Sequence, residues 1–426
     1  MTDEATKPTT TLPPQERPGL FDAYGVEIEM MIVDDRTLDV KPVCDRLIGA
    51  VAGEPVSEIE VGDIAWSNEL TLHVLELKTN GPAPALRGLA SRFHENALRA
   101  NRALEDLGAR LMPGAMHPWM DPAAETRLWP HEYTDVYHAF DRIFGCSGHG
   151  WANLQSTHLN LPFANDEEFQ RLHAAIRIVL PLIPALAASS PFQDGGAGPT
   201  LDGRLMAYRG NARRVPSVAG RVVPEPVTSR DQYERDILQR IYTDLEPYDP
   251  DGTLRHEWVN ARGAIARFDR GTVEIRVIDA QECPTADLAV VAAVSSLVRA
   301  LAVGPLADRE LSADPSTDAL ADLLDRATVQ GERADVVEPE ILAVLGVAGN
   351  PMPLGRLWAR LLDAHAPDDP DGEWTEALET IVRDGPLARR MLSAAGPSPD
   401  HAALGRVGRR LCECLVDNRL LPAEDV

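Results

Sequence analysis

The sequence predicts an α+β fold built on an antiparallel sheet. Segments with a two-residue hydrophobic alternation, typical of strands, are scattered among segments with helical spacing. The strands do not form regular strand–helix–strand units, and no internal repeat is visible. From about residue 285 to the end the pattern is helical throughout. These observations favour an α+β domain followed by a helical region.

Composition and charge narrow the functional classes. The 426 residues are 44% hydrophobic and 25% charged, as in soluble globular proteins. The net charge of −25 argues against nucleic-acid binding, which needs a basic surface. The five cysteines lack the spacing of a zinc site or a redox pair, so we expect reduced thiols. No signal-peptide core or apolar stretch of membrane-spanning length stands out, which predicts a cytoplasmic protein that does not contact a membrane.

The first strong strand covers residues 24–33. Val26, Ile28 and their alternate neighbours share one face, and Glu27 and Glu29 share the other. Two carboxylates about 7 Å apart on one strand face repel each other unless a cation lies above them. A half-exposed strand facing water gives the same pattern, so this strand alone does not establish a site.

A second extended stretch, residues 68–79, carries Glu69 and Glu76 and is ended by Asn80-Gly81-Pro82. An odd spacing of seven places the two carboxylates on opposite faces of an unbroken strand. A bulge or bend must therefore intervene if they act together. The following residues 84–107 have apolar side chains at helical spacing, which predicts a long amphipathic helix that covers the sheet.

Two further strands carry polar faces. Residues 154–163 place His158 and Asn160 on one side, and residues 272–279 place Glu274 and Arg276 on one side. Helices are expected before, between and after these two strands, at the positions 134–144, 166–186, 231–242, 286–303, 316–329, 338–347, 354–364, 373–383 and 402–416. Residues 1–19, rich in threonine, proline and charge, are expected to form a disordered tail.

Four strands thus offer carboxylate or imidazole side chains. Each face is ordinary alone, but four in one chain are less easily accidental. Oxygen ligands dominate, with a single imidazole and no thiolate, which suits Mg²⁺ or Mn²⁺ better than zinc. Several acidic ligands around two or three such ions would form a site for a polyphosphate.

Five short motifs occur in order between residues 20 and 305. They are Gly25-Val26-Glu27-Ile28-Glu29, Glu69 followed by Glu76-Leu77-Lys78-Thr79, His158-Leu159-Asn160, the run from Pro181 to Phe192, and Glu274-Ile275-Arg276-Val277-Ile278-Asp279. Each is weak alone, but five in sequence are fairly specific. In these motifs the chain resembles the glutamate–cysteine ligase family, within the glutamine-synthetase-like carboxylate–amine ligases.

The resemblance implies a sheet curved around a funnel that holds ATP and two or three Mg²⁺ ions. It divides the chain into a glutamine-synthetase-like catalytic domain, residues 20–305, and a helical C-terminal region, residues 306–426. Arg276 would contact the transferred phosphate and, with Asn160, the nucleotide; Glu27 would also be catalytic. The implied metal ligands are Glu27, Glu29, Glu69, Glu76, His158 and Glu274.

The resemblance also implies an ATP-dependent ligase that joins the γ-carboxylate of glutamate to an amine, by default cysteine. Arg209 is the first candidate for the substrate carboxylate and Arg213 the second, with Asn160 also near the substrate. Tyr137 and Tyr133 are candidates for the amine pocket. The chain departs from the family at Lys78, where an apolar residue is common, and at His158-Leu159-Asn160, where one branch has two histidines.

Two alternatives remain open at this point: an amide hydrolase on the same fold, and a binding protein without turnover. The helical C-terminal region either caps the sheet or forms a homodimer contact. The expected partners are small-molecule amino-acid and amine substrates.

Overall fold

The computed structural model describes residues 17–307, 315–347 and 350–423. Among these residues, eight strands form one main sheet in the order β2-β3-β4-β1-β6-β10-β9, with β5 also paired to β1. Every neighbouring pair in this sheet is antiparallel, as predicted. The strands are β1 (Gly25–Asp34), β2 (Glu58–Val61), β3 (Ile64–Asn68), β4 (Val74–Thr79), β5 (Ala109–Met112), β6 (Ser156–Pro162), β9 (Ala264–Arg267) and β10 (Thr272–Asp279).

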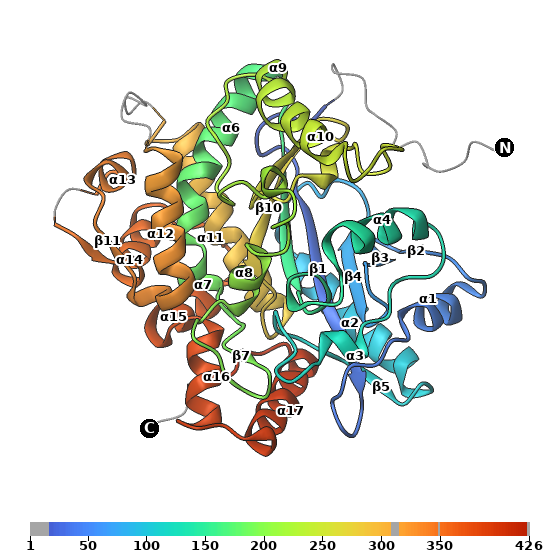
Figure 1. The fold of residues 1–426 in the computed structure, drawn as a ribbon. Coiled ribbons are helices and arrows are strands. Elements are labelled where there is room, and N and C mark those ends of the chain that lie inside the picture. Colours follow the sequence, from blue (N-terminus) through green and yellow to red (C-terminus); the bar gives the residue numbers. More distant parts are fainter. Residues whose placement is uncertain (1–16, 308–314, 348–349, 424–426) are drawn as a thin grey trace.

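The helices lie around this sheet, and those of the C-terminal third gather on one side of it and below it in Figure 1. The first ten are α1 (Cys44–Ala52), α2 (Leu89–Glu105), α3 (Pro122–Glu125), α4 (Thr134–Phe144), α5 (His149–Ala152), α6 (Asp166–Val179), α7 (Pro184–Ala187), α8 (Gly203–Tyr208), α9 (Arg230–Tyr233) and α10 (Gln239–Leu245). The remainder are α11 (Pro284–Ala302), α12 (Thr317–Gln330), α13 (Pro339–Val344), α14 (Leu354–Ala364), α15 (Thr375–Asp384), α16 (Leu387–Ala395) and α17 (His401–Asp417). A small hairpin pairs β7 (Phe192–Gln193) with β8 (Gly196–Ala197). The short strands β11 (Asp335–Val336) and β12 (Met352–Pro353) pair antiparallel, with α13 between them in the chain.

One face of the main sheet forms the core. On β1, Val26, Ile28, Met30 and Ile32 are buried in the main hydrophobic cluster, together with apolar side chains of α2, α6 and α11. Because side chains alternate along a strand, Glu27 and Glu29 must then point to the opposite face. The core side of β1 thus fixes the direction of its carboxylates.

Helix α11 is the central core helix. Among the described residues it is the one helix that is long and apolar enough to cross a membrane, but 78% of its apolar window is buried inside the protein. It packs against α2, α6 and α15. Helix α2 begins at Leu89, later than the predicted residue 84, because Gly88 adopts a left-handed conformation with φ 78°.

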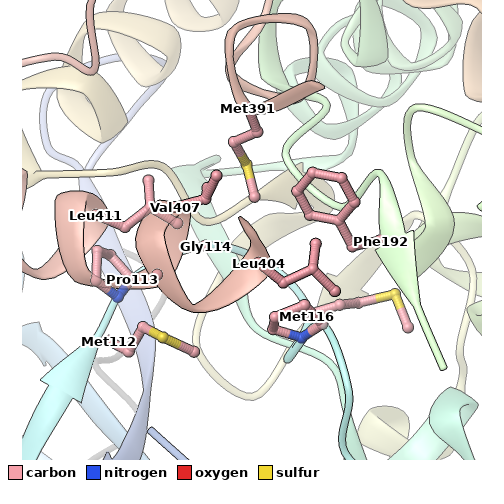
Figure 2. Close-up of a pocket in the computed structure, with 11 residues that line it drawn as sticks. Met112, Pro113, Gly114, Met116, Phe192, Met391, Leu404, Val407 and Leu411 are labelled. Atoms are coloured by element: carbon pink, nitrogen blue, oxygen red, sulfur yellow. The ribbon is translucent and has the colours of Figure 1, made fainter. Parts of the chain in front are cut away.

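The C-terminal helices are joined to the rest of the chain by an apolar contact and a buried ion pair. Figure 2 shows a small apolar pocket where α16 and α17 meet the loop after β5 and the β7 hairpin; Met116, Phe192, Met391 and Leu404 lie around it. Arg390 of α16 forms a fully buried ion pair with Glu282, just before α11. Helix α16 was not predicted, whereas the other predicted C-terminal helices are present.

Outside the described residues lies most of the predicted tail, residues 1–16. The five cysteines are all free and buried. The strand predicted at residues 272–279 and the helix predicted at 134–144 have the expected bounds, as β10 and α4.

Candidate active site

The register of the sheet places the predicted polar residues in neighbouring positions on one face. Glu27 on β1 pairs with Lys78 on β4 and with His158 on β6. One step along β1, Glu29 pairs with Glu76 of β4. On the other side of β6, Asn160 pairs with Glu274 of β10. Residues that are distant in sequence therefore share one surface.

Gly25 at the start of β1 permits this close arrangement. A Cβ atom on Gly25 would lie 3.0 Å from Cβ of Asn160, which is tighter than most real contacts. A larger residue would push β1 and β6 apart beside Glu27. The close approach of β1 and β6 therefore explains why the Gly-x-Glu-x-Glu motif begins with glycine in this chain.

Glu27 and His158 form the centre of the first group of site residues. Nδ1 of His158 donates to Oε2 of Glu27 at 2.9 Å, and Nδ2 of Asn160 donates to Oε1 at 3.1 Å. Burial opposes ionisation of Glu27, but the hydrogen bond and charge of His158 hold its pKa well below the usual range. Burial likewise opposes the charge on His158, yet the surrounding carboxylates raise its pKa to about 9. The pair is therefore ionised at neutral pH.

Glu274 completes this group and carries its own cations. Its carboxylate is 2% exposed, receives a hydrogen bond from Nε of Arg276, and lies 3.5 Å from a guanidinium nitrogen of Arg267. Nδ1 of His158 is 3.9 Å from Oε1 of Glu274. Despite burial, the charge of Arg276 lowers the pKa of Glu274. Arg276 is thus fixed beside the predicted metal ligands.

A second group consists of Glu29, Glu69 and Glu76. One carboxylate oxygen of each lies within 4.8 Å of the others, and Glu76 also belongs to a similar group with Glu27 and His158. Burial and then repulsion from Glu76 raise the pKa of Glu69 well above its usual range. Burial also raises the pKa of Glu29. Ionisation of all three carboxyl groups is therefore unfavourable unless a further cation binds.

Glu69 reaches the group because the chain turns after it. The predicted single strand over residues 68–79 is wrong: β3 ends at Asn68, and β4 begins at Val74. The two strands pair antiparallel, and Glu69 lies in the connection between them. This hairpin connection is the bend that the odd spacing required. Because Glu69 lies outside both strands, strand alternation does not place it on the face opposite to Glu76.

Two serines that the sequence did not single out as functional fix the carboxylates. Oγ of Ser67 donates to Oε1 of Glu76 at 2.7 Å. The backbone nitrogen and Oγ of Ser156 donate to Oε2 of Glu29 at 2.7 and 3.0 Å. Ser156 lies on the same strand face as His158, so its position could have been read from the alternation. Ser67 lies on β3, a strand that the pattern did not reveal.

Of the residues predicted to bind substrate, Tyr137 lies beside the second group, whereas Arg209 and Arg213 have other surroundings. The hydroxyl of Tyr137 accepts a hydrogen bond from Nδ2 of Asn68 at 3.0 Å, and burial followed by the charge of Glu69 raises its pKa. Arg209 instead pairs with Asp325 of α12 at 2.6 Å, and Arg213 is exposed. Tyr133, at the start of α4, is also exposed.

Arg204, for which the sequence predicted no role, contacts the backbone of β10 beside Arg276. It forms a buried ion pair with Asp279, and both terminal nitrogens lie 3.3 Å from the backbone oxygen of Arg276. The β6–β10 register shifts between Ile275 and Ile278, so the backbone around Arg276 is irregular. Arg204 supplies this irregular segment with hydrogen-bond donors.

The comparisons with known proteins agree with this geometry. The family model described as glutamate-cysteine ligase family 2 matches residues 23–413. The chain belongs to this family. The match spans nearly the whole chain and confirms both the predicted family and the predicted enzyme class, an ATP-dependent ligase.

The chain is also similar to individual proteins from other organisms. An uncharacterized protein of Archaeoglobus fulgidus is 32% identical over 86% of this chain and 92% of its own length. A Rubrobacter xylanophilus protein named "Putative glutamate--cysteine ligase 2-3" is 28% identical over 65% of this chain and 69% of its own.

Among solved structures, the glutamate–cysteine ligase of Francisella tularensis in complex with AMP has a TM-score of 0.59 and 13% identity. The match covers 94% of this chain and 90% of that one. At this identity the likeness shows a shared fold, and it confirms the predicted α+β class with a mainly antiparallel sheet.

Proposed function

We propose that the protein is an ATP- and Mg²⁺-dependent carboxylate–amine ligase that forms a γ-glutamyl amide, with glutamate and cysteine as the default substrates. The observation that carries this proposal is the convergence of Glu27, Glu29, Glu69, Glu76, His158 and Glu274 on one sheet face beside Arg276. Such a face suits a charged polyphosphate only when cations are present.

The residues fit divalent metal ions. The donors are carboxylate oxygens and one imidazole, the set that favours Mg²⁺ or Mn²⁺. In the Glu29, Glu69 and Glu76 group, burial and repulsion from Glu76 raise the pKa of Glu29 and Glu69, so a bound cation would favour their ionised form. When bound, the ions would spread the negative charge of an in-line phosphoryl transfer.

In the proposed reaction, the glutamate γ-carboxylate attacks the γ-phosphorus of ATP, and ADP leaves with the electrons of the broken P–O bond. The amine then attacks the resulting acyl phosphate, loses a proton, and releases inorganic phosphate. Arg276 stabilises the transferred phosphoryl group, and Glu274 orients Arg276 through the hydrogen bond to Nε.

The substrates are proposed to contact Arg209, Asn160 and Tyr137. Arg209 could take the glutamate α-carboxylate by exchanging Asp325, its present partner, for the substrate. Asn160 would contact nucleotide or substrate from beside Glu27, and Tyr137 would line the amine side. We propose a cytoplasmic enzyme with residues 20–305 as the catalytic domain and residues 306–426 as a helical cap or dimer contact.

The test is amine-dependent phosphate release. Purified protein would be incubated with ATP, Mg²⁺, glutamate and a panel of amines, and the amide product identified by mass spectrometry. Glu27→Gln should reduce phosphate release by roughly 100-fold or more, because it removes a carboxylate from the charged site. Glu60→Gln, at an exposed position of β2, is the matched control and should retain activity.

Two outcomes would contradict this assignment. Cleavage of γ-glutamyl amides without ATP consumption would identify an amide hydrolase. Nucleotide or metal binding with no turnover across the panel, in a protein that remains folded, would favour a binding protein.

A further inference from the structure

Lys78 lies on the same sheet face as the predicted metal ligands. It follows Glu76 by two residues on β4, so both side chains point to one side. Its register partner on β1 is Glu27. Nζ of Lys78 lies 2.8 Å from Oε2 of Glu58 and 3.3 Å from Oε1 of Glu76. An ammonium group therefore stands among three carboxylates at the edge of the site.

The ammonium group of Lys78 contacts one carboxylate oxygen of Glu76, a residue that belongs to both groups of predicted metal ligands. Oε1 of Glu76 accepts from Ser67 at 2.7 Å and also faces Lys78. Glu76 is the residue shared by the two groups whose ligand atoms lie within 4.8 Å of one another. One oxygen of the shared ligand is thus occupied by the protein itself, which leaves Oε2 for a bound ion.

The position of Nζ is close to that of a metal ion. Divalent ions lie about 2.0–2.6 Å from carboxylate oxygens, slightly closer than the two oxygens that flank Nζ. Glu58 comes from β2, and the register continues Glu58–Ser67–Glu76–Glu29 across four strands. A neutral side chain at position 78 would leave Glu58 and Glu76 facing each other beside Glu27, without a cation between them.

We propose that Lys78 is a built-in cation that takes the place of one divalent ion, so that this site binds one metal ion fewer than it would with an apolar residue at position 78. This inference rests on the proposed function only in that the site binds metal ions. A fixed ammonium cannot be removed by chelation, and it remains in place when nucleotide leaves. It keeps one part of the acidic face neutral through every stage of a reaction cycle.

The alternative role of Lys78 is to form an ordinary surface ion pair with Glu58. Its side chain is 26% exposed, and that of Glu58 is 47% exposed, so the Glu58 contact alone would be an ordinary surface pair. The contact with Glu76 favours the role as a built-in cation, because the side chain of Glu76 is only 8% exposed and belongs to the predicted metal site.

The test counts Mn²⁺ ions bound per chain without nucleotide, by electron paramagnetic resonance of free Mn²⁺ or by equilibrium dialysis. Lys78→Met removes the charge with little change in shape and should bind one more Mn²⁺ than the wild-type protein. Lys78→Arg keeps the charge and should bind the wild-type number. Thermal unfolding in a chelator shows whether each variant is folded.

The double variant Lys78→Met/Glu58→Gln identifies the extra ion. It removes one of the two carboxylates that flank Nζ, so the additional Mn²⁺ should be lost or bound about tenfold more weakly. An extra ion that persists in the double variant overturns the proposed position.

The remaining outcomes separate this inference from the proposed function. Equal Mn²⁺ counts and affinities for wild type and Lys78→Met overturn the role of Lys78 but leave a metal-dependent ligase standing. No Mn²⁺ bound by either folded protein overturns both.

Discussion

His158 donates through Nδ1 to Oε2 of Glu27 at 2.9 Å, so the predicted metal face already contains a charged pair of its own. The pair sits between β1 and β6 and is only slightly exposed. In the protein without metal, the imidazolium balances the charge of Glu27. An ion that uses the His158 ring would have to displace that proton.

The contribution of this pair to stability is expected to fall with rising pH. The pKa of His158 is raised from 6.5 to about 9, so its stabilisation is complete below pH 6.5 and is lost as the pH rises through 9. Glu27, with a lowered pKa, stays ionised over this range. The difference in unfolding free energy between wild type and His158→Asn should shrink by about 3 kcal/mol from pH 6 to pH 10.

Denaturant unfolding in a chelator at both pH values measures this difference. His131→Asn is the control because His131 forms a more exposed pair with Asp45 and should cost less than about 1 kcal/mol. A His158→Asn difference that does not change with pH would show that the imidazole is neutral in the folded protein.

Mn²⁺ is expected to raise the unfolding temperature through the Glu29, Glu69 and Glu76 group. An ion that binds the folded state alone stabilises it by about 2.7 kcal/mol at a concentration 100 times its Kd. Glu69→Gln should abolish most of this shift. It should also stabilise the metal-free protein above pH 4.5, because the raised pKa of Glu69 makes ionisation unfavourable to folding.

Differential scanning fluorimetry with and without Mn²⁺ tests this expectation, with Glu60→Gln as the exposed control. An equal Mn²⁺ shift in Glu69→Gln and wild type would place the ion elsewhere.

Asp287 is a buried carboxylate on the opposite side of the sheet from His158. Asp287 of α11 accepts from Oγ1 of Thr157 at 2.6 Å and from the backbone nitrogen of Gln281 at 2.9 Å, and burial raises its pKa to about 7. Between pH 3.8 and 7 the folded state binds more protons than the unfolded state, so Asp287 lowers stability as the pH rises.

Asp287→Asn mimics the protonated carboxyl and should remove this dependence. Its gain over wild type should increase by about 4 kcal/mol between pH 4 and pH 8. Urea unfolding at the two pH values measures the gain. Parallel curves for the two proteins would mean that Asp287 ionises in the folded state at its ordinary pKa.

Two arginine ion pairs should differ sharply in their contribution to stability. Arg204 and Asp279 are 3% and 0% exposed, whereas Arg221 and Asp318 are 46% and 76% exposed. Arg204→Met leaves a buried carboxylate unpaired and should cost about 3–5 kcal/mol. Arg221→Met should cost less than about 1 kcal/mol. Chemical denaturation measures the loss of unfolding free energy in both variants. Similar losses would contradict the burial of Arg204.

Local patterns in the sequence predicted most of the elements that carry the site. On β1 and β10, apolar and polar side chains alternate around the functional positions, so Glu27, Glu29, Glu274 and Arg276 could be assigned to faces directly. In contrast, all five residues of β3 are buried, and β9 is only four residues long and also buried. Neither shows the alternation that reveals a half-buried strand.

The connection after Glu69 could not be predicted because its partners are distant in sequence. Leu72 donates its backbone N–H to Arg127, and Trp129 donates to the carbonyl of Leu70. No glycine or proline lies between Glu69 and His73 to mark a turn. The contact between Lys78 and Glu58 is of the same kind, since it depends on the β2–β3 hairpin that the sequence did not reveal.

The strand order β4-β1-β6-β10 has a consequence for the maturation of the protein. During synthesis Glu27 emerges long before Glu274, and β6 remains an open edge until β10 has been made and docked. A nascent chain would therefore carry Glu27 and His158 before the Glu274 carboxylate that completes their group. Ion capture at this group would require β10, and a fragment truncated before β10 should retain fewer Mn²⁺ ions on gel filtration than the full chain.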